Sequence, residues 1–560
     1  MAGRTAGMML AAAGAGVLLF AGLGGYALWD PDEAKHALIA REIFESGQWW
    51  APTVNGAPYY HKPSFFYLLV GLAYGGLGVN EFAARLVPAL ACLATVLFVY
   101  REASRPASSQ EDSRTAVGLL ATGLLLCVPC FPFVGRFTNF DSLLMLFITA
   151  TVFRVAAWLD AEEGSPLPWD TWVFAGLATL TKGPVAVLLL LLPLLVFLVS
   201  GRIKLSRLRP GRGVLIFSLV VCAWLLPTFL RNPDYIREFV FVHNIGRYTG
   251  AGGVSFHAQP LWFFIPVCIA CLLPWSALLP AAVGRALAGR DSGRWLAVFC
   301  CWVLVFFSLS HGKLATYIMP AFPAAAVLVA RWLDDNSGRR AAGFNGLALA
   351  ASAALMVALG PASAWFYLEE TGAVYQGPAT LLFWFATAGG LLALSRWRRL
   401  FSVGRISAVL CSSMFLVSLV FSLALGPRVS PFTGDADLAA LVAAEVPAEV
   451  GLASWGIRPW SFRFYADRPL FRKPRAVDYE ALIAGPEPLL LLSKASGMRS
   501  IGGGSAGELR AWRSNFRHTL YANRAAWLLL VAEKTSPTAI SPRPGRRPVA
   551  LVRAVVTMKP

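Results

Sequence analysis

A short segment near the N-terminus places side chains that could perform acid–base chemistry directly beside an apolar run. The hydrophobic residues 8–28 are followed at once by acidic and basic groups, namely Asp32, Glu33, Lys35 and His36. Charged side chains beside membrane hydrocarbon cost several kcal/mol unless they are paired or hydrated. The segment is therefore either a solvated linker or a reaction site in which a carboxylate acts as a base.

Composition indicates the class of protein that carries this segment. Hydrophobic residues make up 57% of the 560-residue chain, charged residues only 14%, and the mean hydropathy is +0.59. These values are typical of a polytopic α-helical membrane protein and exclude an ordinary soluble enzyme. Because a membrane-spanning helix needs about 20 apolar residues, we expect about 13 spans. They are 8–28, 82–101, 115–134, 141–159, 169–182, 184–200, 213–230, 260–282, 295–309, 314–333, 344–367, 379–395 and 406–425.

Basic loops orient these spans. The loops 201–212, 284–294, 334–340 and 396–405 are rich in arginine, and all fall on one side in this count. Since cytoplasmic loops collect Lys and Arg, the N-terminus is expected inside and the C-terminus outside. Residues 64–79 are apolar enough to span, but an extra span would reverse every later loop. Residues 30–80 are therefore predicted to form helices that lie in the outer interface.

With this topology, charged and polar clusters gather on the outer face. They are Asp32–Lys35, His61–Lys62, Arg136–Asp141, Thr181–Gly183, Arg231–His257 and His311–Lys313. The pattern predicts the rim of a cavity, with a scatter of unrelated surface loops as the alternative. The segment 231–259 is long enough to act as a lid or as a platform for an acceptor.

The tail 427–560 differs in character from the rest of the chain. Its apolar runs are short and separated by turn residues, which is typical of a small soluble α/β domain. It carries 19 Lys and Arg against 10 Asp and Glu, so half of the net charge of +18 lies here. On the outer side, such a domain suits anionic head groups or an anionic lipid-linked substrate. Nucleic acid is not an expected partner there.

Several motifs resemble a known family when they are taken together and in order. They are Asp32–Glu42, Ser46–Pro52, Asn55–Gly56, Tyr60–Pro63, Gly78–Leu86, Arg136 with Asp141, Leu180–Pro184, His243–Tyr248, Pro274–Trp275 and Ser310–Pro320. The chain resembles bacterial membrane glycosyltransferases of the lipid A aminoarabinose transferase group, which are related to protein O-mannosyltransferases in the C-type glycosyltransferase superfamily. That family usually has Arg in place of Lys35, often Tyr in place of His36 and commonly Glu in place of His61.

The resemblance implies a fold, an activity and a location. The fold would be the C-type glycosyltransferase fold with an outer α/β domain. The enzyme would be a monomer in the bacterial inner membrane, with its site and C-terminal domain facing the periplasm. It would move a sugar from a polyprenyl-phosphate donor to lipid A or another envelope acceptor, with inversion. A protein O-mannosyltransferase-like enzyme, a lipid-linked sugar transporter or flippase, and a catalytically silent scaffold are the alternatives.

Roles for individual residues follow from the required chemistry and the resemblance. Displacement at an anomeric carbon needs a base, and positive charge beside the leaving phosphate. We expect Asp32 to be the base, with Asp141 sharing the role or helping it hold a divalent cation, and we count Glu33 among the catalytic carboxylates. The candidates for the phosphate are Lys62, Lys182, Lys313 and Arg136, and those for substrate or acceptor are His61, His243, Arg247 and Tyr317.

Overall fold

The structure is a computed structural model. It describes residues 2–105, 111–162, 164–249, 258–273, 275–336, 433–471, 482–494, 510–514 and 518–526, with a few single positions between 412 and 530. The chain divides into two compact units. Unit 1 comprises Met1–Ala439 and Arg458–Asp467, and unit 2 comprises Ala440–Ile457 and Arg468–Pro560.

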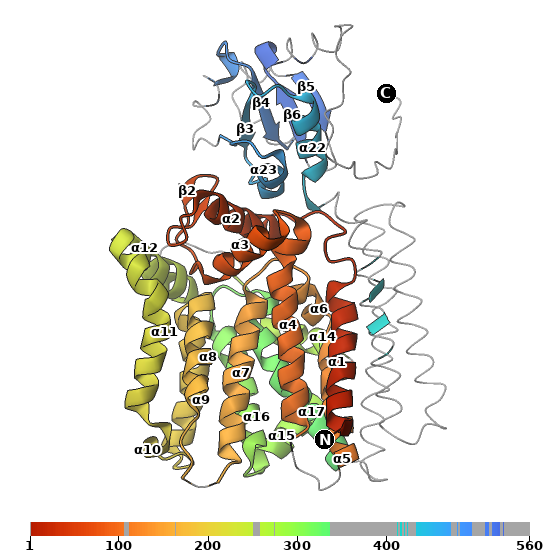
Figure 1. The fold of residues 1–560 in the computed structure, drawn as a ribbon, viewed down its shortest axis with the longest axis vertical. Helices are drawn as coiled ribbons and strands as arrows, with labels where there is room; N and C mark the ends of the chain where they lie inside the picture. The colour runs from red at the N-terminus through yellow and green to blue at the C-terminus, as the bar shows by residue number, and fades with distance from the viewer. Residues whose placement is uncertain are drawn as a thin grey trace. The chain divides into compact units, whose positions relative to one another are not determined.

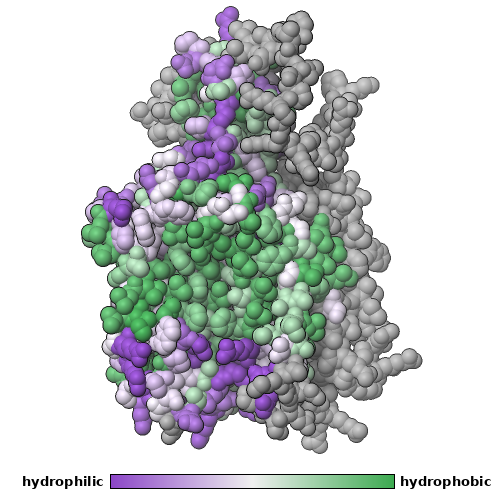
Figure 2. All heavy atoms as spheres, viewed as in Figure 1, coloured by the Kyte–Doolittle hydropathy of each residue, from purple (hydrophilic) through white to green (hydrophobic). Residues whose placement is uncertain are grey.

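Unit 1 is a bundle of helices (Figure 1). The described helices of the bundle are α1 (Ala2–Phe20), α4 (Glu81–Ala103), α5 (Glu111–Leu126), α6 (Cys130–Gly135), α7 (Asp141–Leu159), α8 (Trp169–Lys182), α9 (Pro184–Val199), α10 (Leu205–Leu208), α11 (Pro210–Arg231), α14 (Phe264–Cys271), α15 (Leu279–Ala288), α16 (Ser292–Leu309) and α17 (Phe322–Asp335). Six helical segments in the described residues are long and apolar enough to cross a membrane. On the face in Figure 2, apolar side chains cover the middle of the bundle, and hydrophilic ones gather at the end where α10 lies.

Several predicted spans have different bounds in the structure. The span predicted over 8–28 is helical only to Phe20, because Gly22 adopts a φ of +65° that ends helical geometry. The span 115–134 is two helices, α5 and α6, which separate at Pro129, a residue without a backbone donor. The predicted spans 344–367 and 379–395 lie outside the described residues, as does 406–425 apart from single positions.

Residues 30–80 form two helices and a short hairpin rather than a membrane span. They are α2 (Asp32–Ser46), β1 (Thr53–Val54), β2 (Ala57–Pro58) and α3 (Phe65–Leu77). Acidic residues in the first turn of α2 suit the helix dipole, and Gly47, with φ of +66°, ends the helix. Figure 1 shows α2 and α3 packed together across one end of the bundle.

The segment 458–467, expected in the soluble tail, packs instead with unit 1. It forms α23 (Trp460–Ala466), which lies against α2. Arg41 on α2 donates to the carbonyl of Phe464 at 2.6 Å, and the Ser461 amide donates to the Asp30 carboxylate at 2.9 Å. The bond to Asp30 braces the start of α2, where Asp32 lies, and the bond from Arg41 holds a later turn of the helix.

The predicted loop 231–259 is largely helical where it is described. It contains α12 (Pro233–Arg237), a π-helix η1 (Glu238–Gly246) and α13 (Arg247–Thr249), whereas 250–257 lie outside the described residues. Two 3-10 helices, η2 (Leu261–Phe263) and η3 (Ala315–Ala321), lead into α14 and α17.

Unit 2 contains a four-stranded sheet. Its strands are β3 (Gly451–Trp455), β4 (Leu489–Ser493), β5 (Arg510–Ser514) and β6 (Thr519–Ala522), in the order β3-β4-β6-β5. β3 and β4 are parallel, and the other pairs are antiparallel. The central strand β4 is buried throughout, as its run of leucines predicts. Helix α22 (Ala436–Glu445) precedes β3.

Candidate active site

Asp141 and Lys182 meet because the helices that carry them are consecutive and packed side by side. Asp141 is the first residue of α7, and Lys182 is the last residue of α8. Each charge suits its helix terminus, since carboxylates are stabilised at N-termini and ammonium groups at C-termini. Lys182 Nζ lies 2.6 Å from Asp141 Oδ1, and Thr316 Oγ1 donates to Asp141 Oδ2 at 2.8 Å. Only 13% of the Asp141 side chain and 8% of the Lys182 side chain are exposed.

The ring of Phe140 joins a second lysine to this pair. The Nζ atoms of Lys62 and Lys182 each lie 5.5 Å from its centroid, and Lys182 Nζ lies 4.4 Å from that of Tyr317. An aromatic face attracts a cation within about 6 Å. The structure therefore brings together Asp141, Lys62, Lys182 and Tyr317, four of the residues predicted from the sequence. Phe140 and Thr316 were not predicted, although each adjoins a predicted site residue in the sequence.

Asp32 forms an ion pair with Lys35. The same pair would be expected if this segment were only a solvated linker. Lys35 Nζ lies 2.6 Å from Asp32 Oδ1 within the first turn of α2. The Asp32 side chain is 57% exposed, and exposed ion pairs contribute only about 0–1 kcal/mol. The pairing thus leaves the Asp32 carboxylate accessible to an incoming molecule.

His36 connects the start of α2 with the lysine cluster. Its ring lies 5.0 Å from that of Phe140, and its Nδ1 lies 2.9 Å from the Tyr67 hydroxyl. Burial lowers the pKa of His36 well below its usual value, and the charges of Lys35 and Lys62 lower it further, against Asp32. Burial also raises the pKa of Tyr67. The Tyr67 hydroxyl therefore keeps its proton and is hydrogen-bonded to a neutral imidazole.

We expect the stability of the protein to fall as the pH drops below about 6.5. In the unfolded chain His36 takes up a proton near that pH, whereas the folded protein resists protonation. The unfolded state then binds more protons, which lowers the free energy of unfolding. Thermal unfolding between pH 5 and pH 7.5 measures the effect. His36→Gln keeps a hydrogen-bonding side chain beside Tyr67 but does not titrate, so the slope of its unfolding free energy with pH should be shallower. His311→Gln, at an exposed histidine, is the control and should retain the wild-type slope. An unchanged slope in His36→Gln contradicts the assignment.

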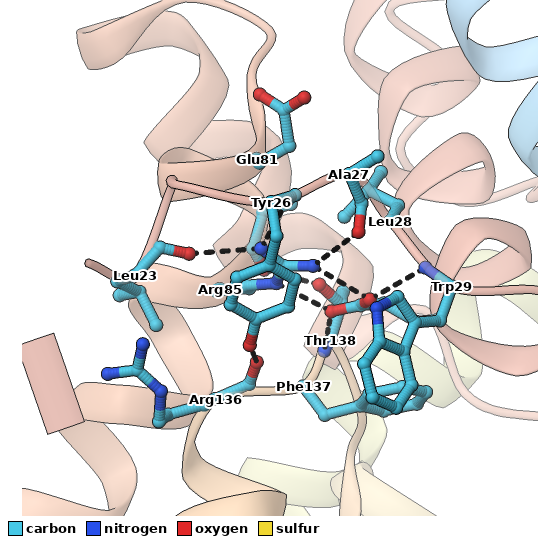
Figure 3. Close-up of polar contacts among 12 residues, drawn as sticks. Leu23, Tyr26, Ala27, Leu28, Trp29, Glu81, Arg85, Arg136, Phe137 and Thr138 are labelled. Atoms are coloured by element: carbon cyan, nitrogen blue, oxygen red, sulfur yellow. Dashed lines mark hydrogen bonds and ion pairs between the residues drawn. The ribbon is translucent and has the colours of Figure 1, made fainter. Parts of the chain in front are cut away.

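Glu33, expected among the catalytic carboxylates, is fully buried and paired with Arg85, and Figure 3 shows Arg85 among its backbone partners. Arg85 on α4 binds both carboxylate oxygens, with Nε 2.7 Å from Oε1 and Nη2 2.9 Å from Oε2. The backbone amides of Trp29 and Thr138 donate to the same oxygens at 2.8 Å and 3.1 Å. These contacts hold the Glu33 carboxylate against the backbone and Arg85, and a catalytic role for Glu33 stays a prediction.

Arg85, which sequence reasoning missed as a site residue, extends this network. Its guanidinium also donates to the carbonyls of Leu23, Tyr26 and Ala27, and it stacks 3.8 Å from the centroid of the Tyr26 ring. The network fixes the chain between α1 and α2 against α4. Its sequence signals were its place in the motif Gly78–Leu86 and its position inside an apolar span, where an arginine is usually paired.

Arg136, expected at the donor phosphate, caps α1. Its Nη1 donates to the carbonyls of Leu18 and Leu19 at 3.1 Å and 3.0 Å, and its own carbonyl accepts from the Tyr26 hydroxyl. Arg136 is buried, and its Nε and Nη2 atoms have no hydrogen-bond partner among the described residues. These contacts give it a structural function at the C-terminus of α1, where a cation is favourable.

Lys313 also forms backbone contacts. It lies between α16 and η3, and its Nζ donates to the carbonyls of Gln259 at 2.8 Å and Ser310 at 2.5 Å. Burial lowers its pKa. Next to it, the His311 amide donates to the Tyr248 carbonyl. Lys313 and His311 thus hold Gln259 and Tyr248, respectively, against the bundle.

The predicted substrate residues His61 and His243 form a stack. Their ring centroids lie 3.9 Å apart, and His61 also stacks on Tyr59 at 4.7 Å. The Tyr235 hydroxyl donates to the Lys62 carbonyl, so the segment carrying His243 lies beside Lys62. Arg247 is the first residue of α13, and its side chain lies outside the described part of the structure.

A metal was expected between Asp32 and Asp141, and each carboxylate binds its own lysine. In the described part of the chain, no group of three or more His, Cys, Asp and Glu side chains could hold a metal ion. The metal site stays a prediction.

Comparison with known proteins relates this arrangement to a family. The family model for dolichyl-phosphate-mannose-protein mannosyltransferase matches residues 61–226. The undecaprenyl phosphate-alpha-4-amino-4-deoxy-L-arabinose arabinosyl transferase of Pseudomonas paraeruginosa is 31% identical over 427 residues, which are 72% of this chain and 73% of that protein. Transferase 1 of the same name from Pseudomonas fluorescens is 32% identical over 368 residues, which span 63% of this chain and 61% of that protein.

Solved structures share the fold. ArnT from Cupriavidus metallidurans bound to undecaprenyl phosphate matches with a TM-score of 0.80 at 24% identity, over 92% of this chain and 98% of that chain. The archaeal oligosaccharyltransferase AglB from Archaeoglobus fulgidus matches with a TM-score of 0.51 at 10% identity, over 88% and 69% of the two chains. The resemblance inferred from the motifs is confirmed. This multi-pass membrane protein belongs to the family of undecaprenyl-phosphate aminoarabinose transferases, which are glycosyltransferases with the ArnT fold.

Proposed function

We propose that the protein transfers a sugar from an undecaprenyl-phosphate donor to lipid A or another envelope acceptor at the periplasmic face of the inner membrane. The names of its relatives make 4-amino-4-deoxy-L-arabinose the first sugar to test. The observation that carries the proposal is the gathering of Lys62, Lys182 and Asp141 around Phe140. They lie beside α2, because the ring of His36 on that helix is 5.0 Å from the ring of Phe140.

The two lysines suit a leaving group that is a phosphate. A unit charge about 4 Å from the phosphate contributes roughly 4 kcal/mol at an effective dielectric constant of about 20. Only the part of this energy that grows as the glycosidic bond breaks accelerates the reaction. Asp141 and Thr316 hold Lys182 in place, and Phe140 and Tyr317 provide faces that accept the cations. Lys182 is thereby oriented before the donor binds.

Asp32 is the proposed base because its carboxylate is exposed, whereas both oxygens of Asp141 are engaged and Glu33 is buried. The acceptor hydroxyl gives its proton to Asp32 as its oxygen forms a bond to the anomeric carbon. The bond from that carbon to the phosphate oxygen breaks, and undecaprenyl phosphate leaves with the electron pair. Attack opposite the leaving group inverts the anomeric centre.

Release of undecaprenyl phosphate by the purified protein tests the proposal. Undecaprenyl-phosphate aminoarabinose and undecaprenyl-phosphate mannose are each incubated with lipid A, with a Ser/Thr-containing peptide, or with no acceptor. Release that requires lipid A supports the proposal, and release that requires the peptide establishes protein O-mannosylation instead. Movement of an intact donor across a vesicle membrane without release establishes a transporter. Chelation followed by return of Mg²⁺, Mn²⁺ or Zn²⁺ tests the metal prediction in the same assay.

Lys62→Met is expected to weaken donor binding as well as turnover. Loss of one charge-assisted contact costs about 1.5–3 kcal/mol, which corresponds to a rise of roughly 10- to 150-fold in the Kd for undecaprenyl phosphate. Binding is measured by quenching of intrinsic tryptophan fluorescence. Lys204→Met, at an exposed lysine before α10, is the matched control. Wild-type affinity in Lys62→Met indicates that Lys62 does not contact the phosphate.

A further inference from the structure

A pocket lies at the end of the bundle away from the candidate active site. It has a volume of about 420 Å³, and its polar lining comprises Arg4, Arg101, Glu102, Arg105 and Arg154. These residues come from α1, from α4 and the residues just after it, and from α7. α7 begins at Asp141 in the active site. At a rise of about 1.5 Å per residue, Arg154 lies about 20 Å further along the helix axis.

The pocket has an excess of positive charge. Its one carboxylate, Glu102, is buried and binds Arg105 at 3.2 Å and Arg331 at 3.1 Å. Arg154 is paired with Asp170 through one nitrogen, while its buried Nε has no hydrogen-bond partner among the described residues. Arg4 and Arg101 form no ion pair with any carboxylate whose side chain the structure describes. The guanidinium groups of Arg4 and Arg101 are therefore available to bind an anion.

The other part of the pocket wall is aromatic. Phe98, Phe153 and Phe174 line it, and the rings of Phe98 and Phe174 lie 6.0 Å apart, edge to face. α4, α7 and α8 face the viewer in Figure 1, and Figure 2 shows their apolar surface giving way to hydrophilic side chains at their lower ends. A ligand that matches this lining has an anionic head beside an apolar chain. A small soluble anion would leave the phenylalanines uncovered by any apolar group.

We propose that this pocket binds an anionic glycerophospholipid. The phosphodiester lies between Arg4 and Arg101, which can hold its oxygens through paired N–H groups. The start of an acyl chain lies on Phe98 and Phe174. Basic pockets between membrane helices recognise anionic lipid head groups in this way. The site is separate from the proposed donor site, because it is lined by none of the residues around Phe140.

Native mass spectrometry of the detergent-purified protein tests the proposal. Phosphatidylglycerol is titrated against phosphatidylcholine with the same acyl chains, and glycerol 3-phosphate is added as a competitor without a tail. Three variants are compared with wild type: Arg4→Ala/Arg101→Ala; Arg101→Lys, which retains the charge but not the paired geometry; and Arg202→Ala/Arg290→Ala. This last pair removes two exposed arginines outside the pocket.

The wild type should retain phosphatidylglycerol in preference to phosphatidylcholine. The Arg4→Ala/Arg101→Ala variant should bind it about tenfold more weakly, Arg101→Lys should be intermediate, and Arg202→Ala/Arg290→Ala should match wild type. Equal loss in the two double variants would show that net charge alone attracts the lipid and would overturn the proposal. Displacement by glycerol 3-phosphate at similar concentration would identify a site for a soluble phosphate instead. The Arg4→Ala/Arg101→Ala variant should release undecaprenyl phosphate in detergent at the wild-type rate. That result would show that its active site is intact.

Discussion

Replacement of Asp32 by asparagine is expected to lower the rate of sugar transfer by about 10²- to 10⁴-fold, the usual contribution of a positioned general base. Asparagine retains the size of the side chain and its place at the start of α2 but cannot accept the acceptor's proton. The exposed pair with Lys35 adds little stability, so the fold should survive. Initial rates of undecaprenyl phosphate release at saturating donor measure the effect.

Glu45→Gln is the matched control for Asp32→Asn. Glu45 lies on the same helix, is exposed, and pairs with Arg41 much as Asp32 pairs with Lys35. Its variant should turn over at the wild-type rate. A pH profile adds a second test, since loss of a base removes the acidic limb of the wild-type profile. Turnover of Asp32→Asn within a few-fold of wild type would exclude Asp32 as the base, and Asp141→Asn would be the next variant to measure.

Replacement of Arg85 by methionine is expected to destabilise the protein by about 3–5 kcal/mol, because it leaves the buried Glu33 charge without its partner. Methionine fills much of the same volume, so the loss reports the missing hydrogen bonds rather than a cavity. The carbonyls of Leu23, Tyr26 and Ala27 lose their donor as well. Thermal unfolding in detergent, with recovery of folded protein after purification, measures the effect.

Removing both charges should not restore stability. A buried ion pair replaced by apolar residues is often neutral, but Glu33 and Arg85 also bind five backbone groups that a Glu33→Leu/Arg85→Met variant would leave unsatisfied. Arg231→Met, at an exposed residue ending α11, is the control and should unfold like wild type. Wild-type stability of the double variant would mean that the network does not hold α2 in place.

The two carboxylates at the start of α2 show why spacing alone did not assign roles. Asp32 and Glu33 are adjacent and equally acidic in the sequence, yet one is exposed and the other fully buried. Successive residues on a helix point about 100° apart. The side on which α4 packs, with Arg85, therefore decided which carboxylate is buried and which is exposed.

The lysines were predicted as one group and separated on folding. Lys62 and Lys182 gather at Phe140, whereas Lys313 turns to the carbonyls of Gln259 and Ser310. Arg136 likewise turns to the end of α1. Lys313 and Arg136 each donate to nearby buried backbone carbonyls that would otherwise lack a hydrogen bond. Those acceptors belong to segments distant in the sequence, so the choice could not be predicted from local pattern.

The sequence by itself determined the membrane class and the family, and it supplied the residues proposed for the site. Hydropathy, charge and motif order can be read from the sequence without knowing which residues are in contact. Only the tertiary structure decided which of these residues are exposed, which are paired, and that Phe140 and Thr316 belong with them. Those outcomes depend on how α2, α4, α7 and α8 pack, because desolvation and hydrogen bonding act between segments tens of residues apart.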